Sequence, residues 1–349
     1  MFLIDVIMEG EDVDLDLLPI VHHAEFDSGK YITAGMTVCR NPDTGILNIG
    51  IYRQEVTEQK RVKCRISPRS NGDYIAKRYA RLGKPMEVVV FIGHHPAVAM
   101  AAAAPIPLNK SEFELMAALL DEPLEVTRAA TVDLPVPARA EIAIEGVIDP
   151  TEMVSDGPLG EASGYYGTEL PCYVIQVTAI TMRHDAIYHD LYPAHQEHVM
   201  VGILARQSSV YDRVKDAVPS VIAVNYGPEA EPGWGIMYLS IKKHSPGDGR
   251  LAGLTALQAD PFVNIVTVVD EDIDVYDEKE VLWAVATRAK RNVEVVTDLF
   301  APAHSGANWN SGEAKVLIDA TMPVDKPFPK RVSPDRKLWD MMRLEDYLS

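Results

Sequence analysis

The feature that most constrains the fold is a change in the spacing of apolar residues near Tyr192 and Pro193. Before this point, short β-branched runs are separated by Gly, Pro, Asn and Asp, a spacing typical of strands joined by tight turns. After it, helical patterns alternate with short apolar strands, which predicts an α/β arrangement. A chain of 349 residues is long enough for two domains. We therefore expect one domain over residues 1–192, a second over 193–330, and a helical tail over 331–349.

The individual elements follow from the same patterns. In the first domain, Asn41-Pro-Asp-Thr-Gly45 supplies a turn between two strand-like segments and so predicts a hairpin. Gly83 ends one helical pattern, and Ser111 and Glu114 have the spacing of a capping box at the start of another. Strands are expected at residues 31–39, 46–52, 62–66, 86–92, within 132–148, and at 173–183, 186–188, 221–224, 235–243, 265–269 and 293–297. Helices are expected at residues 71–82, 96–104, 111–120, 198–214, 249–258, 278–290 and 334–348.

The charge balance excludes several classes of partner. Lys and Arg number 33 and Asp and Glu number 51, so the formal net charge is −18. Such a chain repels nucleic-acid phosphates and anionic membrane surfaces, although one local Arg or Lys can still bind a small anion. The three cysteines form no CxxC pair, and no apolar run approaches the ~20 residues that span a bilayer. Because the N-terminus lacks a basic signal region, the sequence predicts a soluble, cytoplasmic protein.

Two segments carry residues suited to acid chemistry. In Asn48-Ile-Gly-Ile-Tyr-Arg53, the guanidinium of Arg53 offers a planar fork for a carboxylate or phosphate. A five-residue offset on a strand puts Asn48 and Arg53 on opposite faces, unless Gly50 marks a bulge. In Asp156-Gly-Pro-Leu-Gly-Glu161, two carboxylates bracket a Gly/Pro turn, and an adjacent Arg would separate their pKa values and leave one as a proton donor. The ordinary alternatives are a surface ion pair and a solvated acidic turn.

Three further features allow a functional and an ordinary interpretation. Glu112 and Glu114 stand at a helix start, where the helix dipole favours carboxylates in any case. Lys315 follows a Gly-containing turn and leads into an apolar strand, so it points either at an anionic cofactor or at solvent. The spacing of His195-Gln-Glu-His198 does not place two His ligands four residues apart on one helix face, so we interpret it as non-metal. Residues 270–281 likewise lack the Gly and Glu of a calcium loop.

Taken in order, these motifs resemble the UbiD family of decarboxylases. The resemblance rests on Asn-x-Gly-x-Tyr-Arg, a Ser-Glu-x-Glu helix start, Val-Pro-Ala-x-Ala-Glu-Ile, and Asp-Gly-Pro-x-Gly-Glu-x-x-Gly-Tyr-Tyr. They occupy residues 48–53, 111–114, 136–142 and 156–166, and similar segments follow at 240–243, 269–274, 282–288 and 318–321. The similarity therefore runs over nearly the whole chain.

The resemblance implies an α+β and α/β fold, in which a split β-barrel holding prenylated FMN precedes an α/β oligomerisation domain. It also implies reversible decarboxylation of an aromatic or α,β-unsaturated acid, with CO₂ as the second product. By position, Arg53 would bind the substrate carboxylate and pair with Asp156, and Glu161 would donate the proton that replaces CO₂. This chemistry is consistent with a cofactor that accepts electrons, because no side chain does so well enough.

The same resemblance assigns the cofactor site. Asn48 and Glu112 would bind Mn²⁺ or Mg²⁺ at the cofactor phosphate, with K⁺ near the backbone of residues 102–105. Lys315 would contact the phosphate. The implied cofactor-binding residues are Asn48, Ile51, Arg53, Ala102, Ala103, Pro105 and Lys315. The implied partners are a flavin prenyltransferase that supplies the cofactor and further copies of the chain.

Three departures from the family pattern leave alternatives open. Position 156 is Asp where the family often has Glu, residues 67–73 lack a metal-binding His, and the chain begins close to the Gly10-Glu-Asp-Val-Asp14 region. Ser70, Asn71 or Asp73 would have to supply an oxygen in place of the His. The alternatives are therefore a partner-dependent or non-catalytic subunit of a multi-chain carboxylase, and a split-barrel protein that binds ordinary FMN.

Overall fold

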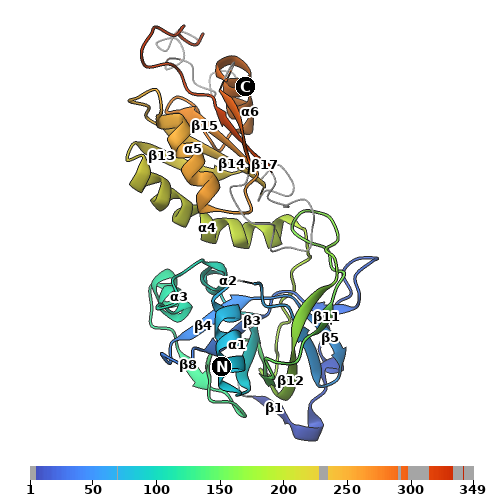
Figure 1. Ribbon diagram of the computed structural model, residues 1–349. Coiled ribbons are helices and arrows are strands. Elements are labelled where there is room, and N and C mark those ends of the chain that lie inside the picture. The colour runs from blue at the N-terminus through green and yellow to red at the C-terminus, as the bar shows by residue number, and fades with distance from the viewer. Residues whose placement is uncertain are drawn as a thin grey trace.

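The computed structural model describes residues 5–68, 70–227, 235–289, 292–297, 314–332 and 341. Within them, the first part of the chain forms a curled ten-stranded sheet (Figure 1). The strand order is β2-β5-β6-β12-β10-β7-β3-β4, and β1 and β11 also pair with β12. All of these pairs run antiparallel. The strands are β1 (Val6–Glu9), β2 (Lys30–Ile32), β3 (Met36–Arg40), β4 (Leu47–Ile51), β5 (Gln54–Glu58), β6 (Arg61–Cys64), β7 (Met86–Ile92), β10 (Ile142–Ile148), β11 (Val154–Asp156) and β12 (Leu170–Met182).

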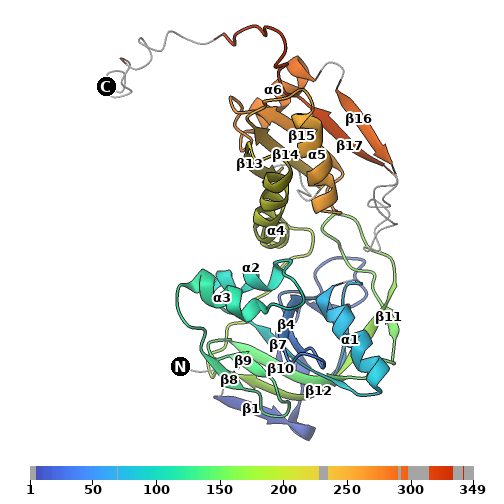
Figure 2. The ribbon, with the colours of Figure 1, turned by 60° about the vertical axis from the view of Figure 1, so that its left-hand side comes forward.

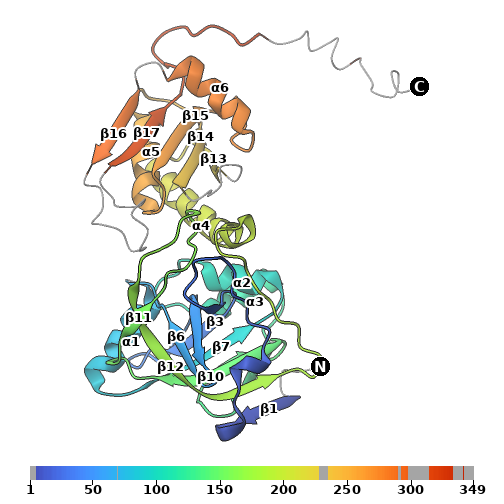
Figure 3. The ribbon, with the colours of Figure 1, turned by 90° about the vertical axis from the view of Figure 1, so that its right-hand side faces the viewer.

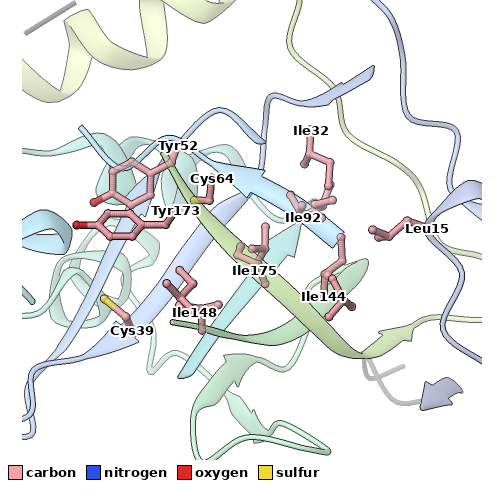
Figure 4. Packing of buried hydrophobic residues seen from close by; sticks show 14 of the residues in the cluster. Leu15, Ile32, Cys39, Tyr52, Cys64, Ile92, Ile144, Ile148, Tyr173 and Ile175 are labelled. Carbon is pink, nitrogen blue, oxygen red and sulfur yellow. The ribbon is translucent and has the colours of Figure 1, made fainter. Parts of the chain in front are cut away.

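The sheet is covered on both faces, and strand β7 shows why. Its sequence is a continuous apolar run, and Val88 and Val90 face one hydrophobic cluster while Val89 and Phe91 face another. The first cluster fills the inside of the curled sheet and includes Ile144, as Figure 4 shows. The second lies beneath the helices of this part of the chain. A strand buried on both faces needs apolar residues at successive positions, which is what the sequence supplies.

The helices of the first part begin and end at recognisable capping residues. Helix α1 (Asn71–Leu82) starts after Ser70, whose hydroxyl accepts a hydrogen bond from the Asp73 amide, and ends at Gly83 with φ of 61°. Helix α2 (Pro96–Ala103) has Pro at its first position, and α3 (Glu112–Leu120) is capped by the Ser111 hydroxyl. Two short 3₁₀ turns (Gly10–Asp12 and Leu15–Leu17) and the small ribbon β8 (Val126–Arg128) with β9 (Pro135–Pro137) complete this part.

The second part is a five-stranded mixed sheet with helices on its faces. The strand order is β13-β14-β15-β17-β16; the two inner pairs, β14-β15 and β15-β17, are parallel, and the outer pairs are antiparallel. Helices α4 and α5 pack against each other and on the sheet, and α6 packs on β15. The strands are β13 (Val221–Tyr226), β14 (Ile236–Ile241), β15 (Ile265–Asp270), β16 (Val293–Thr297) and β17 (Ala314–Asp319). The helices are α4 (Gln196–Ala217), α5 (Asp248–Ala259) and α6 (Glu278–Arg288).

Helix α4 lies between the two parts of the molecule in all three ribbon views (Figures 1, 2 and 3). It packs against α5 and β13 on one side and against α2 of the first part on the other. Among the helices that the structure describes, none combines the length and the apolar character needed to cross a bilayer. The α4–α2 contact joins the two parts of the molecule.

The predicted fold class is confirmed, as are the β3–β4 hairpin and most predicted elements. Helix α1 and strand β7 have the predicted bounds. Two predictions were wrong. Residues 31–39 form two strands, because the chain turns at residues 33–35 and β2 pairs with β5 whereas β3 pairs with β7. Residues 186–188 form no strand, because Ile187 donates its amide to the Glu141 side chain instead of to a neighbouring strand. The predicted tail helix, 334–348, lies outside the described residues except for Met341.

Candidate active site

A cavity of about 780 Å³ lies between the two parts of the molecule. Its walls come from the end of β4, the turn after α2, the loop between β11 and β12, one face of α4, and the start of β17. Four cationic side chains line it, together with small apolar residues. The cationic residues are Arg53, Arg65, Arg206 and Lys315. A space of this size and charge is suited to a large anionic ligand.

Strand β4 brings Asn48 and Arg53 to the same cavity, although their spacing predicted opposite faces. The strand ends at Ile51, so Arg53 lies in the two-residue link before β5 and does not follow the alternation of the strand. Gly50 is needed within β4, because a Cβ there would lie 2.5 Å from the Tyr52 hydroxyl oxygen. The phenol of Tyr52 thus packs back against the strand at Gly50, where only a residue without a side chain leaves room for it.

Arg53 is held between the two carboxylates that the sequence singled out. Its Nε donates to Oδ2 of Asp156 at 2.8 Å, and its Nη2 lies 2.7 Å from the same oxygen. Its Nη1 donates to Oε1 of Glu161. Asp156 is completely buried, whereas the Glu161 side chain keeps 24% of its surface exposed, on the cavity side. Burial raises the pKa of Glu161, with Asp156 adding to that shift and Arg53 opposing it.

A second group of contacts fixes the loop that carries Asp156 and Glu161. The hydroxyl of Tyr31, itself fully buried, donates to Oδ1 of Asp156 at 3.1 Å and lies 2.8 Å from the Ser28 hydroxyl. One oxygen of Asp27 accepts the amide of Gly160 at 3.0 Å. The N-terminal segment therefore holds both ends of this loop in place.

Glu112 also lines the cavity, next to Asn48. Its Oε1 accepts the Asn48 side-chain amide and its Oε2 accepts the Ile49 backbone amide, both at 2.8 Å. Burial raises the pKa of Glu112 to about 7, and these hydrogen bonds oppose the shift. Glu114, two residues further on, is exposed. Within the described residues, no three His, Cys, Asp or Glu side chains lie close enough together to hold a metal ion.

The other predicted cofactor-binding residues also line the cavity. Ile51, Ala102, Ala103 and Pro105 form its wall on the β4 and α2 side. Lys315 is 1% exposed, and its ammonium donates to the carbonyl oxygens of Pro261, at 2.7 Å, and of Val263. Burial lowers the pKa of Lys315 to about 8.

Sequence reasoning assigned no role at this site to several residues that the structure brings to the cavity. Arg65 follows β6, and His198 and Arg206 lie on α4. Arg206 stacks over the ring of Phe262, with 4.7 Å from its guanidinium carbon to the ring centroid, and pairs with Asp260 at 3.5 Å. His195, by contrast, caps the start of α4. The helical period places His198 and Arg206, which are eight residues apart, near the same face of α4. The sequence does not show that this face lines a cavity.

The fold and the site define a class of enzyme. Residues 3–196 match the family model of the 3-octaprenyl-4-hydroxybenzoate carboxy-lyase Rift-related domain. Residues 198–320 match the model of the C-terminal domain of the same carboxy-lyase. These two matches cover most of the chain, and both models describe a carboxy-lyase, which is therefore the class of this enzyme. The chain belongs to the UbiD family.

Individual relatives agree with this assignment. The chain is 36% identical over 317 residues to the anhydromevalonate phosphate decarboxylase of Methanothermobacter thermautotrophicus, over 89% of this chain and 74% of the relative. It is similar to the UbiD-class enzyme HmfF from Pelotomaculum thermopropionicum in complex with FMN (TM-score 0.91, 37% identity, 99% of this chain and 78% of that one). An evolved dimeric form of HmfF in complex with prenylated FMN gives a TM-score of 0.88 at 36% identity, over 99% and 77% of the two chains.

Proposed function

We propose that this protein is a decarboxylase of a small aromatic or α,β-unsaturated carboxylic acid, and that it uses prenylated FMN. The observation that carries the proposal is the Arg53 guanidinium, held between the Asp156 and Glu161 carboxylates at the wall of a large cavity. An arginine placed in this way would bind a carboxylate, and the partly buried carboxylic acid beside it would supply a proton.

The cavity fits the cofactor that its structural relatives bind. It is large, it is bordered by small residues at Ala102 and Ala103, and the cationic groups Lys315 and Arg206 face it from the second part of the molecule. Arg53 and Ile51 would border the ring system, and Lys315 the phosphate end. When bound, prenylated FMN supplies the electron sink that decarboxylation requires.

The protein residues bind the substrate and move one proton. Glu161 gives up its ionic contact with Arg53 when it becomes protonated, and the substrate carboxylate then binds to Nη1 in its place. Burial favours this protonated state, because it disfavours the charge on Glu161. The C–CO₂ bond breaks, CO₂ leaves, and the Glu161 proton is transferred to the carbon. Asp156 keeps Arg53 oriented through its contacts with Nε and Nη2.

The metal prediction is supported in part by the donor atoms. Asn48 and Glu112 supply oxygen ligands of the kind that Mg²⁺ and Mn²⁺ prefer. Ser70 and Asn71, which would supply an oxygen in place of the His that the resemblance implies, also line the cavity. Two adjacent donors are too few for a complete site, so no step of the reaction is assigned to a metal here. Potassium near residues 102–105 stays a prediction.

The proposal also covers the molecules that the protein would exchange. It would take a small acid, release CO₂, receive its cofactor from a flavin prenyltransferase, and assemble with further copies of itself. The relative from Methanothermobacter thermautotrophicus, by its name, decarboxylates a phosphorylated acid. A panel of test acids therefore includes aromatic, α,β-unsaturated and phosphorylated members.

The test is the Glu161→Gln variant, purified after co-expression with a flavin prenyltransferase. We expect this variant to retain as much cofactor as the wild type and to lose at least about 99% of its turnover, because Gln cannot donate the proton. Glu169→Gln is the matched control: its carboxylate lies in the same loop but accepts a hydrogen bond from Ser155. Unchanged turnover in Glu161→Gln would reject the role of Glu161. Turnover that appears only after a second protein is added would favour the partner-dependent subunit.

A further inference from the structure

Arg65 is a second arginine that lines the site. It follows the last residue of β6, and its backbone amide donates to the Arg53 carbonyl at 3.0 Å. The two arginines are therefore held side by side by the sheet. The Arg65 side chain lines the cavity and is partly buried. Its Nη1 donates to the Pro171 carbonyl at 2.9 Å, which fixes the direction of the guanidinium.

The surroundings of Arg65 disfavour its charge. Burial and the neighbouring Arg53 both lower the pKa of Arg65, whereas Asp156 and Glu161 raise it. Within the described residues, no carboxylate lies within 4.0 Å of its guanidinium, in contrast to Arg53, which has two. A cation placed beside another cation at a cavity wall, without an ion pair of its own, is poorly explained by stability alone.

The charges around Arg53 explain why a second cation is useful. With Glu161 ionised, Arg53 alone faces two carboxylates, which leaves one negative charge in excess. When Glu161 is protonated and a substrate carboxylate takes its place beside Arg53, the excess of one negative charge is the same. If Arg65 is included, two cations face two anions both before and after the substrate enters. An uncompensated charge in a partly buried site is costly, and a third carboxylate approaching it would be repelled.

We propose that Arg65 is the balancing cation of the reaction centre, which keeps the centre electrically neutral before and after the substrate carboxylate enters beside Arg53. This inference rests on the proposed function. In the decarboxylation step, the substrate loses its carboxylate charge as CO₂ departs, and Glu161 gains a negative charge as its proton forms the new C–H bond. The total charge is the same on both sides of this step, so one fixed cation serves both. Arg65 acts through Glu161 and the substrate and is therefore a positioning residue.

The charged groups that act on Glu161 come from three places in the fold. Arg53 lies between β4 and β5, Asp156 ends β11, and Arg65 follows β6. Across the cavity, α4 contributes His198 and Arg206 to the wall. Because a nearby cation favours the ionised form, removing Arg65 must raise the pKa of Glu161.

The first experiment measures the ionisation of Glu161 without turnover. A pH titration is followed by infrared spectroscopy at the protonated-carboxyl band that disappears in Glu161→Gln. The full-length protein is used without any carboxylic acid substrate. We expect Arg65→Gln to raise the midpoint of this band by about half a pH unit or more. Arg65→Lys keeps the charge and should keep the midpoint. Arg61→Gln is the matched control, because it removes an arginine from β6 that does not line the cavity. Arg61 pairs instead with Glu58 and Glu152.

The second experiment uses the cofactor-loaded enzyme and whichever acid of the panel it decarboxylates. Arg65→Gln should raise KM at least about tenfold and move the alkaline limb of the kcat–pH profile to higher pH, because Glu161 then stays protonated longer. A merely structural role would lower kcat or stability without moving that limb. An unchanged midpoint and an unchanged limb in Arg65→Gln, with an active wild type, would overturn the role of Arg65 alone. A wild type that is inactive on every acid would instead contradict the proposed function.

Discussion

Asp156 shows how single residues set the geometry of this site. Its side chain is completely buried, and each of its oxygens has a partner: Arg53 on one and Tyr31 on the other. A buried carboxylate requires such partners, because the cost of removing it from water must be offset by hydrogen bonds and opposite charge. The methylene lost by having Asp in place of Glu does not prevent the contact, since Nε of Arg53 reaches it at 2.8 Å.

At this scale we predict the effect of Tyr31→Phe. The variant removes the hydrogen bond to the Asp156 carboxylate, so the free energy of unfolding should fall by about 1.5–3 kcal/mol. KM for the acid should also rise a few-fold, because Asp156 then holds Arg53 less firmly. Denaturant unfolding and steady-state kinetics measure both effects. Tyr173→Phe is the control: Tyr173 is also buried, and its hydroxyl makes no hydrogen bond to the described residues. Equal stability of the two variants would contradict the role of Tyr31.

The residues that sequence reasoning identified were those that lie in ordered motifs. Arg53, Asp156 and Glu161 could be grouped because their segments combine Gly, Pro and charged residues at fixed spacing. Tyr31 and Arg65 could not, since each reads as an ordinary strand residue until the pairing of the strands brings it to the site. Asn48 and Arg53 were expected to face apart unless Gly50 marks a bulge; they line the same cavity because alternation applies only within a strand, and β4 ends at Ile51.

At the scale of elements, an irregularity in strand β10 determines how the curled sheet is built. The register between β10 and β12 shifts between Glu145 and Gly146. A Cβ at Gly146 would lie 2.5 Å from the carbonyl oxygen of Gln176 and 2.6 Å from a methyl carbon of Ile175. Irregularities of this kind bend a strand and allow an antiparallel sheet to curl.

We therefore predict that Gly146→Ala destabilises the protein. The new methyl group meets backbone of the neighbouring strand, which cannot move away as the end of a side chain can. The free energy of unfolding should fall by about 2 kcal/mol or more. Gly160→Ala is the control, since its nearest neighbour would be a Pro193 carbon at 3.7 Å. A stable Gly146→Ala would show that the sheet tolerates a different curvature at this position.

Elements with strong local signals were predictable from the sequence, and those defined by pairing were not. Ser70 and Gly83 bound helix α1 through their own chemistry, so its limits were correct. The split between β2 and β3 depends on which strands they pair with, and residues 186–188 are held by a side chain. Such long-range partners leave no local trace in the sequence.

At the scale of the whole molecule, the site is shared between two parts that pack across α4. Arg53, Asp156 and Glu161 belong to the first part of the chain, while Lys315 and Arg206 reach the cavity from the second part. These local cations would allow a chain with net charge −18 to bind the anionic cofactor that we propose. The account therefore predicts that this chain, with both parts present, loads the cofactor.

The most direct test is an absorbance spectrum with mass spectrometry of the released ligand, on protein co-expressed with a flavin prenyltransferase. The account predicts a coloured protein whose ligand has the mass of prenylated FMN, and which decarboxylates at least one acid of the panel. A known homologue prepared in parallel verifies that the co-expression supplies the cofactor. A colourless, ligand-free protein beside a loaded homologue would contradict the account, and bound FMN without activity would indicate the ordinary flavin-binding alternative.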